Sequence, residues 1–287
     1  MAAALVFDDV RVDDGGRPAI DGLTFETSSR HLLVLGAPRA MFEAVSGMRG
    51  VRRGRIGVDG EEPRAAAAAG TLAGAPLDPP MPPSWTLRRF VDESAALVGH
   101  PPAERERLVR DALAAMRLEG LATALLGKSM VHVRRGAVVA AALATGARTI
   151  VVEDPLAGFT DEASRGFGRV LVGALEDRSW MVFAGRAPLG SPFGTHAEEA
   201  LVVLGSSLVA QAAPAEIAVR ESAYVIRVAG PREEFAAALE GRGVRVDIRG
   251  DAFMVDVGSR TTTVLFEVAR DTGAVIVDLR PLAGGFV

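Results

Sequence analysis

Short apolar runs broken by Gly and Asp turns fill the first sixty residues, and this pattern predicts a β-rich region. One stretch, about Met41–Met48, interrupts these runs and is expected to form a helix. The strands that we expect here are Leu5–Val12, Leu23–Glu26, His31–Leu35 and Arg55–Val58.

Residues 61–85 differ in character, because Ala, Pro and Gly dominate them. They end in Pro79-Pro80-Met81-Pro82-Pro83, which neither a helix nor a central strand tolerates, so the segment is expected to be a loop. From Thr86 the pattern becomes helical, with Thr86 as the N-cap of a helix at Leu87–Val98 and a second helix over 101–116. Together these features predict a helical subdomain over about 86–135.

A core of alternating helices and strands follows the helical subdomain. Residues 137–144 are uniformly small and apolar, and Thr149–Val152 is typical of a strand that is buried on both faces. A helix at Glu162–Glu176 and a strand at Trp180–Ala184 continue the alternation. The order helix, buried strand, helix, strand predicts an α/β fold.

The last part of the chain, about 220–280, has a different rhythm. The pattern predicts the order βαββαβ, which is the ferredoxin-like arrangement, in a small α+β domain. We expect a larger domain at 1–218 and an accessory domain at 219–287 whose role is packing or regulation. The expected strands are Ala223–Val228, Val244–Ile248, Phe253–Val257 and Ala274–Leu279, and the expected helices are Arg232–Glu240 and Thr261–Arg270.

Composition excludes several classes of function. With 49% hydrophobic residues and 24% charged residues, the chain can bury a large core, and a net charge of −4 argues against nucleic acid as a partner. There is no cysteine, and the four histidines show no ligand spacing, so neither disulfides nor a metal site is expected. No apolar run approaches the roughly 20 residues of a spanning helix, which predicts a cytoplasmic protein without membrane insertion.

Four framework segments carry a resemblance to a known family. In their order and spacing, they resemble the nucleotide-binding subunit of ABC-2 type ATP-binding cassette (ABC) exporters over nearly the whole chain. The resemblance implies that residues 1–218 form an ABC ATPase-like domain, which is a P-loop NTPase core with a β-rich and a helical subdomain. The segments are residues 19–25 (AIDGLTF), residues 46–50 (SGMRG) with 54–60 (GRIGVDG), residues 151–158 (VVEDPLAG) and residues 213–217 (APAEI).

The phosphate-binding positions of the family are altered. A P-loop of the form G-x-x-x-x-G-K-[ST] needs glycines for close backbone approach, a lysine for phosphate charge and a hydroxyl for Mg²⁺. The only lysine of the chain, Lys128, lies far from this stretch. Gly36 is the one glycine that remains, with Arg39 and Met41 at glycine positions, Phe42 at the lysine position and Glu43 at the hydroxyl position. A carboxylate there repels a triphosphate, whereas Arg39 could supply the lost charge by folding back over the loop.

The resemblance also implies positions for the other nucleotide-site residues. The adenine-stacking aromatic falls near Asp14, the Mg²⁺-reporting glutamine near Leu77 and the switch histidine near Gly185 or Arg186. Glu153 and Asp154 stand where the Walker B aspartate and the following glutamate are expected. The signature motif of the family falls on Ser129, Met130, Val131, His132 and Val133 and lacks both of its glycines.

These changes predict a pseudo-ATPase that binds neither ATP nor Mg²⁺ as a cofactor. The expected partners are transmembrane permease subunits or a catalytic cassette, in a homo- or heterodimer at the inner face of the membrane. Docking is expected around Leu77–Arg89, where Pro82, Pro83 and Trp85 could meet a partner helix. One alternative is an authentic ATP-binding subunit that uses Arg39 for phosphate charge and Asp154 as base. A second is a soluble scaffold protein that works outside transport.

Overall fold

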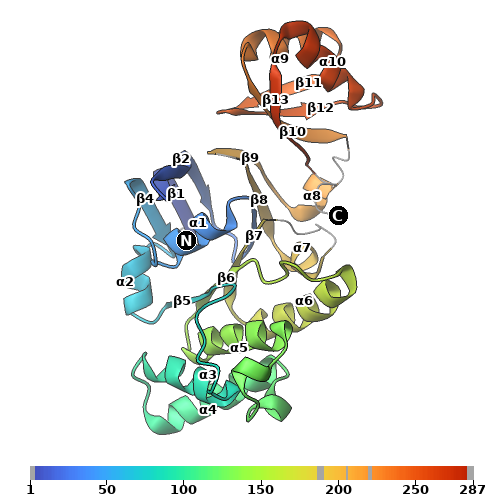
Figure 1. The fold of residues 1–287 in the computed structure, drawn as a ribbon. Coiled ribbons are helices and arrows are strands. Elements are labelled where there is room, and N and C mark those ends of the chain that lie inside the picture. Colours follow the sequence, from blue (N-terminus) through green and yellow to red (C-terminus); the bar gives the residue numbers. More distant parts are fainter. Residues whose placement is uncertain (1–3, 186–190, 205, 219–221, 283–287) are drawn as a thin grey trace.

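Three sheets and the helices between them form the part of the chain that the structure describes (Figure 1). The computed structural model describes residues 4–185, 191–204, 206–218 and 222–282. An antiparallel sheet at the N-terminus, a mostly parallel central sheet and an antiparallel sheet near the C-terminus follow one another along the chain.

The N-terminal sheet has the order β2-β1-β4, from strands Arg17–Thr27, Leu5–Asp14 and Arg53–Val58. Its inner face is apolar, and the rings of Phe7 and Phe25 stack with their centroids 4.6 Å apart. Both β1 and β2 are longer than predicted. Gly15 and Gly16 have positive φ and make the tight turn between them, so pairing continues to the very ends of the hairpin.

The central sheet has the order β5-β6-β7-β3-β8-β9, in which only β9 is antiparallel to its neighbour. Every residue of β6 is buried, as a strand covered on both faces requires. The carboxyl ends of β3, β6 and β7 share one edge, which is where α/β sheets carry their sites. The bounds are Leu72–Ala75 (β5), Thr149–Glu153 (β6), Ser179–Ala184 (β7), His31–Leu35 (β3), Glu199–Leu204 (β8) and Ser207–Ala212 (β9).

The expectation of a loop over 61–85 is wrong at two places. Helix α2, Pro63–Ala68, begins with a proline at its first turn, where a missing N–H costs nothing, and the Glu62 side chain caps it by accepting from the Ala65 N–H at 3.1 Å. Strand β5 forms because its backbone pairs with β6, although Ala and Gly have little strand preference of their own. The proline-rich stretch 79–83 lies outside helix and strand, as predicted.

Helices cover the two faces of the central sheet. Helix α1, Pro38–Val45, packs between the central and N-terminal sheets, and α2 shares its core through Ala66. The helices from α3 to α8 lie against or beyond the opposite face. The Thr86 hydroxyl accepts from the Arg89 N–H at 3.2 Å, so the predicted N-cap of α3 is confirmed. The bounds are Leu87–Ala96 (α3), Pro102–Ala115 (α4), Val131–Ala144 (α5), Asp161–Leu175 (α6), Pro192–His196 (α7) and Pro214–Ala218 (α8), with 3₁₀ turns at Glu119–Leu121 and Leu126–Lys128.

The C-terminal unit has the predicted order βαββαβ, and its sheet is antiparallel with the order β11-β12-β10-β13. Helices α9 and α10 cover one face through a core that includes Phe235 and Phe253. On the other face Val225 joins the main core, and Ser207 of β9 donates a hydrogen bond to Asp251 at 2.8 Å. The bounds are Ala223–Ala229 (β10), Arg232–Gly241 (α9), Arg245–Arg249 (β11), Ala252–Asp256 (β12), Thr263–Thr272 (α10) and Val275–Pro281 (β13).

Candidate functional site

The connection from β3 to α1 is short. Only Gly36 and Ala37 separate Leu35 from the first helical residue, Pro38, so α1 begins three residues earlier than predicted. Gly36 has φ 105°, and a Cβ there would lie 1.9 Å from the Val203 carbonyl oxygen, so only glycine fits. Because residues 38–43 are helical, their backbone does not form the wide loop that cradles a phosphate with several N–H groups.

Both side chains at the most critical P-loop positions are buried. Met41 and Phe42 lie in the core between the N-terminal and central sheets. A Cβ on Gly74 of β5 would lie 3.3 Å from the Phe42 ring, so Phe42 packs directly against this strand. At the lysine position, the chain therefore carries a core side chain, and no charge reaches the edge of the sheet from it.

Glu43 is held in ion pairs with two arginines. Arg49 Nε donates to its carboxylate at 2.6 Å, and Arg39 Nε donates at 3.0 Å from one helical turn earlier. Arg49 also reaches the Asp13 carbonyl at 2.5 Å and the Asp14 carboxylate at 3.3 Å. The hydrogen bond that Arg49 donates to Glu43 is the main reason why the pKa of Arg49 is raised. Arg39 thus lies beside Glu43, which favours a role in neutralising this carboxylate.

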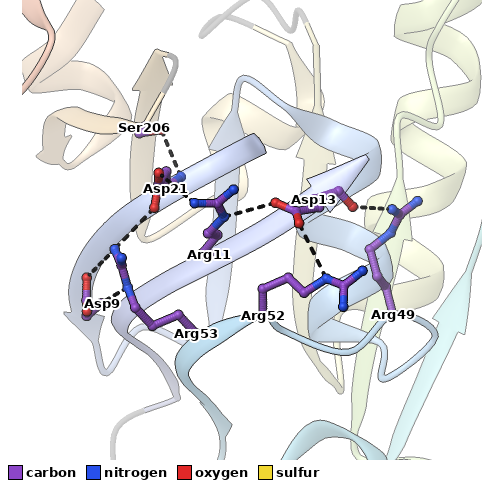
Figure 2. A network of polar contacts seen from close by, with 8 residues as sticks. All are labelled: Asp9, Arg11, Asp13, Asp21, Arg49, Arg52, Arg53 and Ser206. Atoms are coloured by element: carbon purple, nitrogen blue, oxygen red, sulfur yellow. Dashed lines mark hydrogen bonds and ion pairs between the residues drawn. The ribbon is translucent and has the colours of Figure 1, made fainter. Parts of the chain in front are cut away.

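An ion-pair network continues from Arg49 across the N-terminal sheet (Figure 2). Arg11 bridges Asp13 and Asp21, at 3.0 and 3.5 Å, and Arg53 bridges Asp9 and Asp21, at 2.9 and 3.1 Å. The network alternates positive and negative groups on a half-exposed surface. Its guanidinium charges are compensated locally, which leaves little net positive field for a triphosphate.

The two carboxylates at the end of β6 accept hydrogen bonds from neighbouring loops. Glu153 is buried and accepts from the Leu77 N–H at 3.0 Å. Asp154 has φ 35° and accepts from the Gly185 N–H at 3.1 Å. Burial raises the pKa of Asp154 more than the Gly185 N–H and the charge of Arg135 lower it. Arg186, the other position predicted for the switch histidine, lies outside the described residues.

The signature positions lie at the start of α5. The Ser129 hydroxyl donates to the Leu125 carbonyl at 2.9 Å, and Met130 provides no side-chain cap for the helix. Met130 is 66% exposed, Val131 and His132 are also exposed, and Val133 is buried. The hydroxyl is thus engaged within its own turn, and the helix start presents mainly apolar atoms to solvent.

The residues predicted for partner docking are partly engaged within the chain. Trp85 is half-buried, and the Arg89 guanidinium lies 4.5 Å from the centre of its ring. The carbonyl of Trp85 accepts a hydrogen bond from the Leu126 N–H at 2.9 Å. The carbonyl of Pro83 accepts from the Gly127 N–H at 3.0 Å, although Pro83 itself is exposed. Pro82 is half-buried. This segment is therefore anchored on the second 3₁₀ turn and exposes only part of its surface.

Neither a metal cluster nor a spanning helix occurs in the described ranges. Within them, no group of three or more His, Cys, Asp or Glu residues could hold a metal ion. None of the helices described is both long enough and apolar enough to cross a membrane.

The fold matches solved structures. No protein-family model matches the sequence, and no curated protein does. cbiO1 from Clostridium perfringens, part of the ABC transporter complex cbiONQ, aligns with TM-score 0.65 and 14% identity over 76% of this chain and 91% of its own. MJ1267 in its ADP conformation, an ATP-binding cassette of an ABC transporter, aligns with TM-score 0.64 and 14% identity over 76% of this chain and 95% of its own. The chain therefore has the mixed α/β fold of ATP-binding cassettes.

Proposed function

We propose that this chain is a non-hydrolysing subunit with the shape of an ATP-binding cassette. The observation that carries the proposal is the course of the backbone after β3, where α1 begins at Pro38 and buries Phe42 in place of a lysine. Glu153 and Asp154 support it, because both carboxylates accept backbone N–H groups instead of facing open solvent together. Hydrolysis needs a free carboxylate that orients a water and a metal held at phosphate oxygens.

The proposed place of action is an ABC-2 type transporter or a related envelope or motility complex. There the chain would dock on transmembrane permease subunits or on a catalytic cassette, at the cytoplasmic face of the membrane. cbiO1, which has the same fold, is part of a transporter complex. The assignment to the ABC-2 type rests on the resemblance of the framework segments and on the C-terminal unit that follows them.

A groove between α2, β5, α3 and α5 is the docking surface that we propose. It encloses about 530 Å³, and its lining is mainly alanine, glycine and other apolar residues. Leu97, at the end of α3, is 91% exposed beside it, which is unusual for a leucine outside an interface. An apolar helix of a partner would bury this leucine.

The C-terminal unit is proposed to be a separate ferredoxin-like domain that starts near residue 219. Its sheet, read from the other edge, has the order β13-β10-β12-β11, in which the first and last strands of the unit are adjacent. This order and the two helices on one face support the assignment. Its contact with β9 supports a packing role within the same chain.

Calorimetry with Mg-ATP at millimolar concentration tests the loss of nucleotide binding. We expect no heat and no thermal shift from the purified chain, because a lysine and several backbone contacts, each worth about 1.5 to 3 kcal/mol, are missing. An Arg39→Ala variant serves as the matched control, since Arg39 is the one residue at the altered loop that could replace the lysine. Binding with a dissociation constant below about 100 μM, roughly 5.5 kcal/mol, that disappears in Arg39→Ala would support the authentic ATP-binding subunit instead.

Co-sedimentation with inner-membrane vesicles from the native cells tests docking. We expect the chain to sediment with the vesicles and Leu97→Asp to reduce the bound fraction about tenfold, because a charge replaces apolar contact at the groove. Leu121→Asp, an exposed position away from the groove, is the matched control and should bind like the original chain. Equal loss in both variants would argue against the groove as the docking surface.

A further inference from the structure

A cavity of about 290 Å³ lies between the segment after β5 and the first half of α5. This volume is close to the lower end of small-ligand pockets, about 300 to 1,000 Å³. None of the residues from Gly36 to Glu43 lines it, so it is distinct from the altered P-loop. Its walls combine the apolar side chains of Leu77, Met81 and Val138 with the charged side chains of Asp78, Arg134 and Arg135.

Arg135 has a hydrogen-bond donor without an acceptor. Its Nη1 donates to the carbonyls of Ala157, at 2.6 Å, and Pro155, at 3.3 Å. Its Nε is enclosed and has no hydrogen-bond partner within the described residues. Burial lowers the pKa of Arg135, against the opposing charges of Asp78 and Asp154, which form no direct ion pair with it. Because this Nε is enclosed, an anion in the cavity would meet Arg135 through the charge and the outer atoms of its guanidinium group.

Arg134 adds a second charge to the same cavity. Its Nη1 donates to the Ser129 carbonyl at 3.1 Å, and it forms no ion pair across the residues that the structure describes. Two guanidinium groups therefore face the single carboxylate of Asp78 in the lining, which leaves a net positive charge. A positive end and an apolar wall in one cavity match a molecule with an anionic head and a short apolar tail.

We propose that this cavity binds a small organic anion whose carboxylate or phosphate head lies at Arg134 and Arg135 and whose apolar tail lies against Leu77, Met81 and Val138. This inference goes beyond the proposed function, because the site needs neither ATP nor a partner subunit. Guanidinium groups bind both heads through two parallel N–H donors, so the two sources of anion have to be separated by experiment.

Titration of the full chain, followed by the Nε–Hε signals of arginine in ¹H–¹⁵N NMR spectra, tests the proposal. The probes are hexanoate, inorganic phosphate and hexanamide, the last as a neutral match for hexanoate. We expect saturable binding of hexanoate below about 10 mM, a shift of the Arg135 signal, and hexanamide at least about tenfold weaker. Tighter binding of phosphate than of hexanoate would assign the natural ligand to phosphate compounds. No saturable shift with either anion would overturn the proposal.

Variants separate the cavity from nonspecific anion binding. Arg134→Gln should weaken hexanoate binding about tenfold by removing a charged donor, and Asp78→Asn should strengthen it about threefold by removing a repelling charge. Arg165→Gln, on the exposed side of α6 and likewise without an ion pair in the described ranges, is the matched control and should bind unchanged. The proposal fails if Arg134→Gln and Arg165→Gln bind alike, or if Mg-ATP displaces hexanoate.

Discussion

Arginines serve two regions of this molecule in opposite ways. Beside the N-terminal sheet, Arg11 and Arg53 each contact two carboxylates (Figure 2). Arg49 contacts the carboxylates of Glu43 and Asp14, so the network neutralises itself. On α5, Arg134 and Arg135 donate only to backbone carbonyls. A guanidinium group in a direct ion pair stabilises the fold, whereas Arg134 and Arg135, which form no direct ion pair within the described residues, keep their charge for a ligand. Glu43, at the end of the segment predicted for a P-loop, is bound to Arg49 of the first region, and the proposed anion cavity lies in the second.

The largest effect that would break this comparison is expected at Arg49. Arg49→Leu removes the main partner of Glu43 and leaves that mostly buried carboxylate with Arg39 alone. We expect a loss of about 2 to 3 kcal/mol in the free energy of unfolding, measured by urea denaturation.

Arg53→Leu is the matched control for Arg49→Leu. Arg53 also contacts two carboxylates, but both it and they lie at the exposed end of the network. Its loss should cost at most about 1 kcal/mol and should become smaller in high salt. Equal costs for the two variants would show that the network acts as a surface charge cluster without a structural centre at Arg49.

Local patterns predicted the fold well where a segment's own residues decide its structure. Short apolar runs located β1, β3, β6 and β7, the cap at Thr86 located α3, and the pattern of the last sixty residues predicted the observed order of elements. Strand β5 was missed because its Ala and Gly residues become a strand only through pairing with β6. The helix predicted at about Met41–Met48 lies three residues too late in the chain, because α1 begins at Pro38, which a helix tolerates in its first turn.

The candidate site could be predicted only in part for the same reason. The resemblance pointed to Phe42, Glu43, Glu153 and Asp154, but the partners of these residues come from distant segments. Arg49 lies within the framework segment 46–50, and no local pattern connects it to Asp14, 35 residues earlier in the chain. The N–H groups of Leu77 and Gly185 meet the two carboxylates only after the strands have assembled. Likewise, the cavity beside Arg135 depends on how the segment after β5 packs on α5.

The smallest effect, and the one that sharpens the comparison most, is expected at Asp154, whose charge acts on Arg135. Burial raises the pKa of Asp154 in the folded protein above its unfolded value of about 3.9. The carboxyl group therefore contributes stability below that unfolded pKa and loses this contribution as the pH rises through the folded pKa.

Asp154→Asn keeps an oxygen for the Gly185 N–H and cannot ionise. The urea midpoint of Asp154→Asn, compared with that of the original chain at the same pH, should therefore increase as the pH rises from about 4 to 7. A decrease over this range would contradict the prediction. Asp177→Asn is the control, because Asp177 is an exposed residue just after α6, and this variant should show no such increase. An equal increase in both variants would mean that the burial of Asp154 does not cause the effect.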